Sequence, residues 1–166
     1  GTSGRPHPTE GTAVADPLRL RFQTTHAALA TVVGERMGIV GPRLCVSTAC
    51  ASGNVALVLA ADLLRADHVD VVLVGGAEAL SERRFAGFHA LGALAPGACA
   101  PFSVPVGMSL GEGAGFLVLE AERFARDRGA RARAHLSGAA LSVDAWHATA
   151  PDPAGDGMAR AIAGAL

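Results

Sequence analysis

The sequence predicts a layered α/β fold with a parallel component, and two patterns carry this prediction. A long apolar run at residues 50–66 lies between the β-rich run 43–48 and the Val/Leu run 70–76. A second strand–helix–strand succession occupies residues 115–142. Strands that alternate with helices along the chain are typical of α/β proteins that contain parallel pairing.

The individual elements follow from hydrophobic periodicity and from the glycines that end segments. Residues 24–38 place apolar side chains at helical spacing and end at Gly38, whereas residues 1–20 lack periodicity and are predicted to be a loop. The run at 70–76 is continuous in Val and Leu, as in strands that are buried on both faces. The predicted helices are 24–38, 50–66, a short charged helix ending at Arg128 and one from about Asp156; the predicted strands are 43–48, 70–76, 115–121 and about 134–142.

Composition excludes several classes of protein. The 166 residues are 50% hydrophobic with a formal net charge of −1, so the chain can bury a core and shows no basic stripe for nucleic acid. No apolar run is long enough to cross a membrane, and the first residues lack a signal-peptide pattern. The three cysteines show no zinc-ligand spacing. We therefore expect a cytoplasmic protein with no metal, no nucleic-acid partner and no membrane partner.

The most informative stretch is 46–54, where a β-branched run passes into small residues and then into a long apolar helix. Cys50 lies at that junction, where backbone N–H groups and the helix dipole favour a thiolate and can hold an oxyanion. A cysteine at a strand end can equally be a small buried hydrophobe, so both interpretations stay open on this pattern alone. Cys45 is assigned the inert, buried role, and Cys99 lies in a Gly/Pro/Ala loop without supporting context.

Four motifs, in order along the chain, resemble those of β-ketoacyl-acyl carrier protein synthases of the KAS II branch. STACASG at 47–53 resembles the nucleophile motif of that family, and VGGAE at 74–78 resembles the strand and turn that follow the nucleophile helix. GEGAG at 111–115 resembles the turn before the next strand, and DAWHATAP at 144–151 resembles a mobile loop. The resemblance covers nearly the whole chain.

The resemblance implies a thiolase-like layered α/β/α fold, of which residues 1–166 would form one half of a duplicated five-layer architecture, incomplete at both ends. It implies that an acyl chain is transferred to Cys50 and condensed with malonyl-acyl carrier protein by decarboxylative Claisen condensation, in fatty-acid or polyketide/polyene biosynthesis. No cofactor is then expected, because the substrates are carried on the phosphopantetheine of acyl carrier protein. That carrier is an expected partner.

The resemblance also implies a dimer and further site residues. We expect a homodimer, or a heterodimer with a ketosynthase-like subunit, with residues 43–48 at the interface. Phe88 matches an aromatic residue that lines the acyl pocket of the family, against the simpler role of a core phenylalanine. His147 matches a histidine of the gating loop, against the simpler role of anchoring that loop. Glu78 and Glu112 are expected to bond backbone groups at glycine-rich turns.

The sequence departs from the family pattern in groups that carry chemistry. The family uses one histidine in a His-Gly-Thr motif, one in a later Gly-His pair, and a lysine; none of the six histidines here has either context, and the sequence contains no lysine. The segment 101–107 also lacks the Asp and the Arg-Asp pair that are usual there.

Alternative hypotheses are a non-catalytic partner subunit that resembles a chain-length factor, an inactive ketosynthase fragment, and a condensing enzyme that uses coenzyme A thioesters. Chain-length factors typically lack the nucleophilic cysteine, so Cys50 argues against the first. The turn at 111–115 and the loop at 144–151 favour the carrier-protein branch over coenzyme A.

Overall fold

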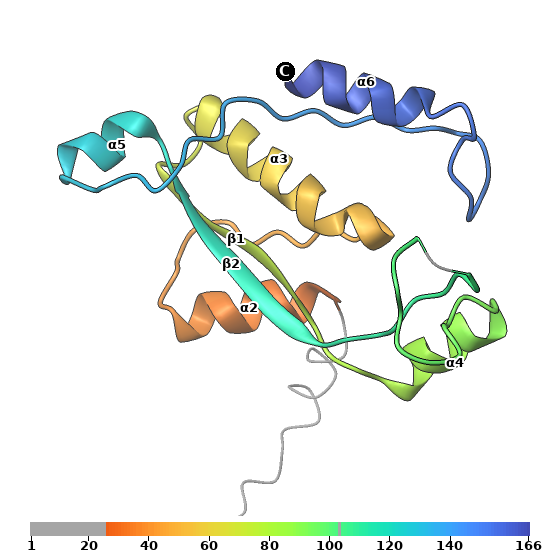
Figure 1. Cartoon of the computed structure of the whole chain (residues 1–166). Helices are drawn as coiled ribbons and strands as arrows, with labels where there is room; N and C mark the ends of the chain where they lie inside the picture. Colours follow the sequence, from red (N-terminus) through yellow and green to blue (C-terminus); the bar gives the residue numbers. More distant parts are fainter. Residues whose placement is uncertain (1–25, 103) are drawn as a thin grey trace, which may run out of the picture. The chain divides into compact units, whose positions relative to one another are not determined.

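The computed structural model describes residues 26–102 and 104–166, which fall into two compact units (Figure 1). The first unit ends at Cys45 and contains helix α2 (His26–Arg36), which confirms the helix predicted around residues 24–38. The predicted loop 1–20 and the first two residues of that predicted helix lie outside the described residues. The second unit begins at Val46 and contains all the other described elements.

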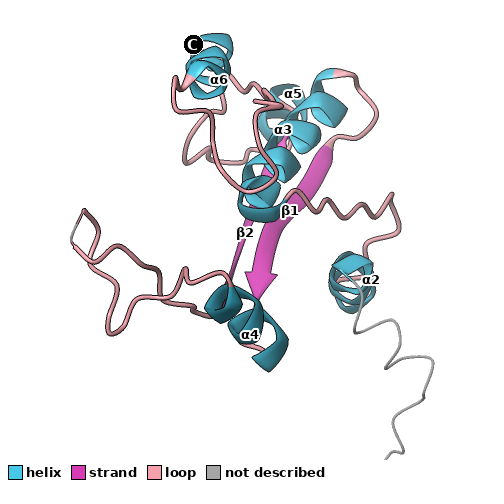
Figure 2. Cartoon of the chain, turned by 90° about the vertical axis from the view of Figure 1, so that its right-hand side faces the viewer, coloured by secondary structure: helices cyan, strands magenta, loops and turns pink. Residues whose placement is uncertain are grey.

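The second unit alternates helices with two strands, as Figure 2 shows by colour. Its elements are the 3₁₀ turn η1 (Ala49–Ala51), α3 (Ser52–Arg65), β1 (Val71–Glu78), α4 (Glu82–Ala90), β2 (Gly113–Glu120), α5 (Glu122–Asp127) and α6 (Asp156–Ala165).

The centre of the second unit is an antiparallel ladder of β1 and β2, with Val71 opposite Glu120 and Glu78 opposite Gly113. Helix α3 lies along this ladder and contacts mainly β1 (Figures 1 and 2). The buried apolar residues of this unit among those described are two alanines of α3 and one valine of β1, namely Ala60, Ala61 and Val74. Small alanines let the helix approach the strand closely. The helix 50–66 and the strands 70–76 and 115–121 are thus confirmed, but the ladder they build is antiparallel rather than parallel.

Two predicted strands are wrong. Residues 43–48 and 134–142 have no strand assignment, although the first run contains β-branched residues and the second is rich in Ala and Leu. A strand exists only when a neighbouring chain segment completes its hydrogen-bonded ladder. Within the part of the chain that the structure describes, the single sheet has two strands and provides no ladder for either segment.

Strand β2 leaves large apolar side chains open on both of its faces. Phe116, Leu117 and Val118 are 41%, 55% and 60% exposed. Successive residues of a strand point to opposite faces, so both faces of β2 are accessible along this stretch.

In the described ranges, no helix is long and apolar enough to cross a membrane.

Gly75 lets the two strands meet beneath an aromatic ring. A Cβ atom built on Gly75 would lie 2.6 Å from Cδ1 and 2.7 Å from Cα of Phe116, and against the carbonyl oxygen of Gly115. The neighbouring Gly76 has nothing within 4 Å of the same atom. The ladder therefore requires glycine at position 75, whereas there is space for a side chain at position 76.

We expect Gly75→Ala to lower the free energy of unfolding by about 1–3 kcal/mol, the usual cost of forcing a methyl group into occupied space. Gly76→Ala is the matched control and should change it by less than about 0.5 kcal/mol. Urea unfolding followed by circular dichroism measures both. Equal losses for the two variants would show that the close approach at Gly75 does not limit stability.

Candidate active site

Cys50 is the middle residue of η1, and its side chain is exposed. Ala49, directly before it, has a positive φ of 52° although it is not glycine. The left-handed conformation costs a non-glycine residue about 1–2 kcal/mol, because its Cβ atom comes too close to the following carbonyl oxygen. The chain thus turns sharply just before Cys50 and enters α3 two residues later.

The hydroxyl of Ser52, the first residue of α3, holds this turn. Its Oγ accepts the backbone N–H of Thr48 at 2.8 Å and donates to the carbonyl oxygen of Ala49 at 2.7 Å. The backbone N–H of Ser52 donates to the same carbonyl, and that of Ala51 donates to the carbonyl of Thr48 at 3.3 Å. The conformation that places Cys50 is therefore fixed by one side chain as well as by the backbone.

The electrostatic setting of Cys50 is that of a helix start. The first turn of α3 carries no acidic side chain, so no local charge offsets the positive end of the helix dipole. An accessible sulfur at such a place can attack an electrophilic carbonyl and later leave from it. The geometry therefore fits a thiol nucleophile.

Exposure does not separate the three cysteines. Cys45, Cys50 and Cys99 are all exposed, so the expectation that Cys45 is a buried strand residue is wrong, whereas its low reactivity stays a prediction. The backbone N–H of Cys99 donates to Oγ of Ser109 at 3.0 Å, within the long connection before β2. What sets Cys50 apart among them is its position in the turn that begins α3.

Phe88 lies on α4, half-buried, and lines a small hollow of about 70 Å³. Its other walls come from the β1–α4 junction, α4 and the turn before β2. They are Glu78, Ala79, Leu80, Ser81, Arg84, Leu110 and Gly111, and Cys50 is not among them. Pockets for small molecules measure roughly 300–1,000 Å³, so this hollow is too small to enclose a long acyl chain.

Helix α4 itself was not predicted from the sequence, and a local signal for it exists. Ser81 precedes Glu82, and its Oγ accepts the backbone N–H of Arg84 at 3.3 Å, which caps the helix. Serine at the N-cap followed by an acidic residue in the first turn is a typical helix start. The helix has only nine residues, and four of them are polar, so the sequence shows no extended apolar period there.

Two glutamates brace the same region. The Glu112 carboxylate accepts the backbone N–H of Leu80 at 3.3 Å, which confirms its expected role at a glycine-rich turn. Glu78 instead pairs with the guanidinium of Arg84, so its partner is a side chain and not the backbone group expected. Arg84 also donates to the carbonyl oxygen of Ala79 at 2.8 Å. Both contacts fix the entry into α4, on which Phe88 lies.

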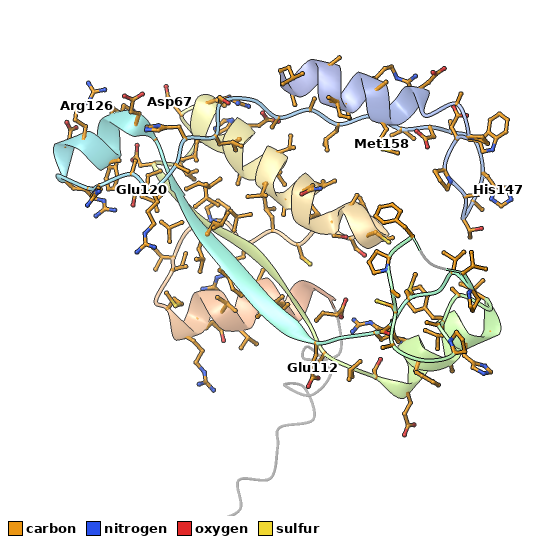
Figure 3. All side chains as sticks on the ribbon, viewed as in Figure 1. Asp67, Glu112, Glu120, Arg126, His147 and Met158 are labelled. Atoms are coloured by element: carbon orange, nitrogen blue, oxygen red, sulfur yellow. The ribbon has the colours of Figure 1, made fainter. Side chains whose placement is uncertain are left out.

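His147 lies in the loop before α6 and organises it (Figure 3). Its Nδ1 accepts the backbone N–H groups of Thr149 at 3.1 Å and of Ala150 at 3.2 Å. Oδ2 of Asp144 accepts the N–H of Asp152 at 3.1 Å. These contacts give His147 the loop-anchoring role weighed above, and they require an unprotonated Nδ1.

The three predicted site residues come from separate elements of the second unit. The N-terminal end of α3, helix α4 and the loop of His147 all lie toward the same end of this unit, on the right in Figure 1 and facing the viewer in Figure 2. Cys50 and His147 do not line the hollow of Phe88. Within the described ranges, no group of three or more His, Cys, Asp or Glu side chains could hold a metal ion.

The second unit is an α/β unit with an accessible thiol in the turn that begins α3, and comparison with known proteins specifies its family. Residues 8–125 match the family model of the beta-ketoacyl synthase, N-terminal domain. Nodulation protein E of Rhizobium meliloti is 42% identical over 127 residues, which cover 75% of this chain and 32% of that protein. The 3-oxoacyl-[acyl-carrier-protein] synthase 2 of Staphylococcus aureus is 37% identical over 137 residues, 78% of this chain and 34% of that one.

Solved structures agree. The ishigamide ketosynthase/chain length factor superposes with a TM-score of 0.79 at 42% identity, over 86% of this chain and 35% of that one. The AntDE:AntF complex is a type II polyketide acyl carrier protein with its ketosynthase. It superposes with a TM-score of 0.78 at 37% identity, over 84% of this chain and 36% of that one. The chain belongs to the β-ketoacyl synthase family and has its thiolase-like α/β fold. It spans about a third of the length of these relatives.

Proposed function

We propose that this chain carries the nucleophile of a β-ketoacyl-acyl carrier protein synthase, with Cys50 as the residue that accepts the acyl chain. The observation that carries the proposal is the accessible thiol of Cys50 in the turn that begins α3, within a member of this family. Residues 1–166 would be the N-terminal, nucleophile-bearing region of that enzyme.

In the first half-reaction, the Cys50 thiolate attacks the carbonyl carbon of an acyl group held as a thioester on the phosphopantetheine of acyl carrier protein. A new carbon–sulfur bond forms, the old one breaks, and the carrier leaves as its thiol after taking a proton. Backbone N–H groups at the start of α3 are suited to hold the oxyanion of the tetrahedral intermediate.

In the second half-reaction, the bond between the carboxylate and the methylene carbon of malonyl-acyl carrier protein breaks, and carbon dioxide leaves. The electron pair of that bond forms an enolate, which attacks the thioester carbonyl on Cys50. A carbon–carbon bond forms, the Cys50 thiolate leaves, and the β-ketoacyl chain remains on the carrier. The histidines that would hold the enolate in this family have no match among the residues of this sequence.

The remaining site residues have supporting roles in this proposal. Phe88 would contact the acyl chain from α4, and His147 would set the shape of the loop through which substrates pass. Acyl carrier protein is the proposed partner, supported by the AntDE:AntF complex, and a ketosynthase-like subunit is the proposed dimer partner. A cytoplasmic location follows from such a partner.

A partner subunit that resembles a chain-length factor is the alternative. The ishigamide structure pairs a ketosynthase with such a factor, and this chain is similar to it over 86% of its length. Such factors typically lack the nucleophilic cysteine, so Cys50 favours the catalytic subunit.

A labelling experiment distinguishes the two functions. The purified protein is incubated with octanoyl-acyl carrier protein, digested, and mapped by mass spectrometry. We expect the octanoyl mass on the peptide that contains Cys50, and we expect limiting iodoacetamide to modify the same thiol first. Because all three cysteines are exposed, preferential labelling of Cys45 or Cys99 would overturn the assignment, and an acyl-free Cys50 in a protein that binds a ketosynthase would support the alternative.

A further inference from the structure

We propose that Ser52 is a positioning residue for the nucleophile, and that its hydroxyl aims the peptide group between Ala49 and Cys50. This inference rests on the proposed role of Cys50. It concerns a side chain that does not itself meet the substrate, and it is carried by two hydrogen bonds from a single oxygen atom.

The Ser52 hydroxyl bonds to backbone groups that precede its helix in the sequence. A capping serine accepts N–H groups that lie ahead of it, as Ser81 does with Arg84 at the start of α4. Ser52 instead accepts from Thr48, four residues behind, and donates to Ala49, three residues behind. No side-chain cap is formed at the N-cap of α3, Ala51. The hydroxyl is therefore used on the turn of Cys50 rather than on the helix.

The carbonyl of Ala49 belongs to the same peptide group as the N–H of Cys50. A peptide group is planar and trans, so its C=O and N–H point in opposite directions. Ser52 donates from its hydroxyl and from its backbone N–H to this carbonyl. Fixing the carbonyl therefore fixes the direction of the Cys50 N–H, which points away from Ser52.

The conformation that Ser52 holds is one that the backbone disfavours. Ala49 has a φ of 52°, a region that alanine leaves when nothing retains it. Strained residues persist where surrounding contacts determine them, and they gather at functional sites. Without the hydroxyl, the peptide before Cys50 can rotate, and the Cys50 N–H loses the direction that the bonded carbonyl gives it.

The test compares Ser52→Thr with Ser52→Val, two side chains of nearly the same shape of which only threonine keeps a hydroxyl. The purified protein is treated with limiting iodoacetamide at pH 7 and at pH 9.5, and modification of Cys50 is followed by mass spectrometry. We expect Ser52→Val to slow Cys50 modification about tenfold at pH 7 and by less than about threefold at pH 9.5, a pH at which an ordinary cysteine thiol is mostly ionised. Ser52→Thr should stay within about twofold of the parent at both values.

A control removes a hydroxyl that also bonds to backbone but lies elsewhere. Ser109 accepts the N–H of Cys99, and Ser109→Ala should leave the modification rate of Cys50 unchanged. With octanoyl-acyl carrier protein, Ser52→Val should lower kcat for acylation about tenfold and leave KM within about twofold.

Each other outcome overturns the proposal. Equal modification rates for the Thr and Val variants would show that the hydroxyl does not position Cys50, and an equal loss at both pH values would indicate a general disturbance of the fold. The alkylation rates do not depend on any acyl transfer. A protein that fails to condense acyl groups but shows the predicted pH dependence would thus reject the proposed function and retain the role of Ser52.

Discussion

Replacement of Cys50 by serine in a complete synthase that contains these residues is expected to abolish condensation, with a loss of at least about 10⁴-fold in the rate of β-ketoacyl product formation. A serine hydroxyl is not ionised near neutral pH, and no described side chain beside Cys50 is placed to remove its proton. The weak nucleophile would also form an ester, from which the enolate displaces the alkoxide less readily than a thiolate. Product formation from octanoyl- and malonyl-acyl carrier protein, followed by mass spectrometry, measures the loss.

The chain offers a matched control for this substitution. Cys99 is equally exposed but lies in the long connection before β2, so Cys99→Ser should retain activity within about twofold. A Cys50→Ser variant that kept a tenth or more of the parent rate would reject a covalent acyl intermediate on this residue.

The 166-residue chain by itself is expected to form no β-ketoacyl product above background. The enolate must be held as it forms, and the groups that the family uses for this, two histidines in Gly-containing motifs and a lysine, have no counterpart in the sequence. Loss of a single oxyanion donor costs about 10²–10³ in rate, and here several are lacking. Transfer of the acyl chain to Cys50 can survive weakly, since η1 and the start of α3 lie within the chain.

The assay for this prediction uses the chain as the sole ketosynthase component, with a ketosynthase of the same family as the positive control. Turnover of the order of 1 s⁻¹ by the chain alone would contradict the prediction, since that is an ordinary enzymatic rate. It would show that residues among these 166 stabilise the enolate in a way the family pattern does not describe.

Elements whose signal is local were predictable from the sequence. The helix at 50–66 and the strands at 70–76 and 115–121 agree with α3, β1 and β2 to within about two residues. Periodicity and apolar runs record the environment of each segment, and turns at glycines mark its ends. Pairing is not local, because an extended segment contains no record of which neighbour completes its ladder. The runs 43–48 and 134–142 were therefore assigned as strands that the described sheet does not contain.

The candidate site divides in the same way. The position of Cys50 at a turn before a helix followed from the small residues around it, and the motif resemblance singled out Phe88 and His147. The sequence does not predict that Ser52 holds the turn of Cys50. Its hydrogen bonds to Thr48 and Ala49 form only because the folded turn brings these earlier backbone groups to the Ser52 hydroxyl. The tautomer of His147 likewise depends on the loop conformation, which the sequence motif does not specify.

The pairing of Glu78 with Gly113 has a consequence for the order in which the protein folds. The two strands are joined by residues 79–112, so their ladder closes a long loop at an entropic cost of roughly 3 kcal/mol. Contacts between α3 and β1, by contrast, need only the short turn between them. During synthesis, β1 therefore emerges and docks on α3 well before β2 exists, and its apolar edge stays unpaired in the meantime. Such an edge is a site where nascent chains associate with one another, so the yield of folded protein should depend on how quickly the segment through Glu120 is completed.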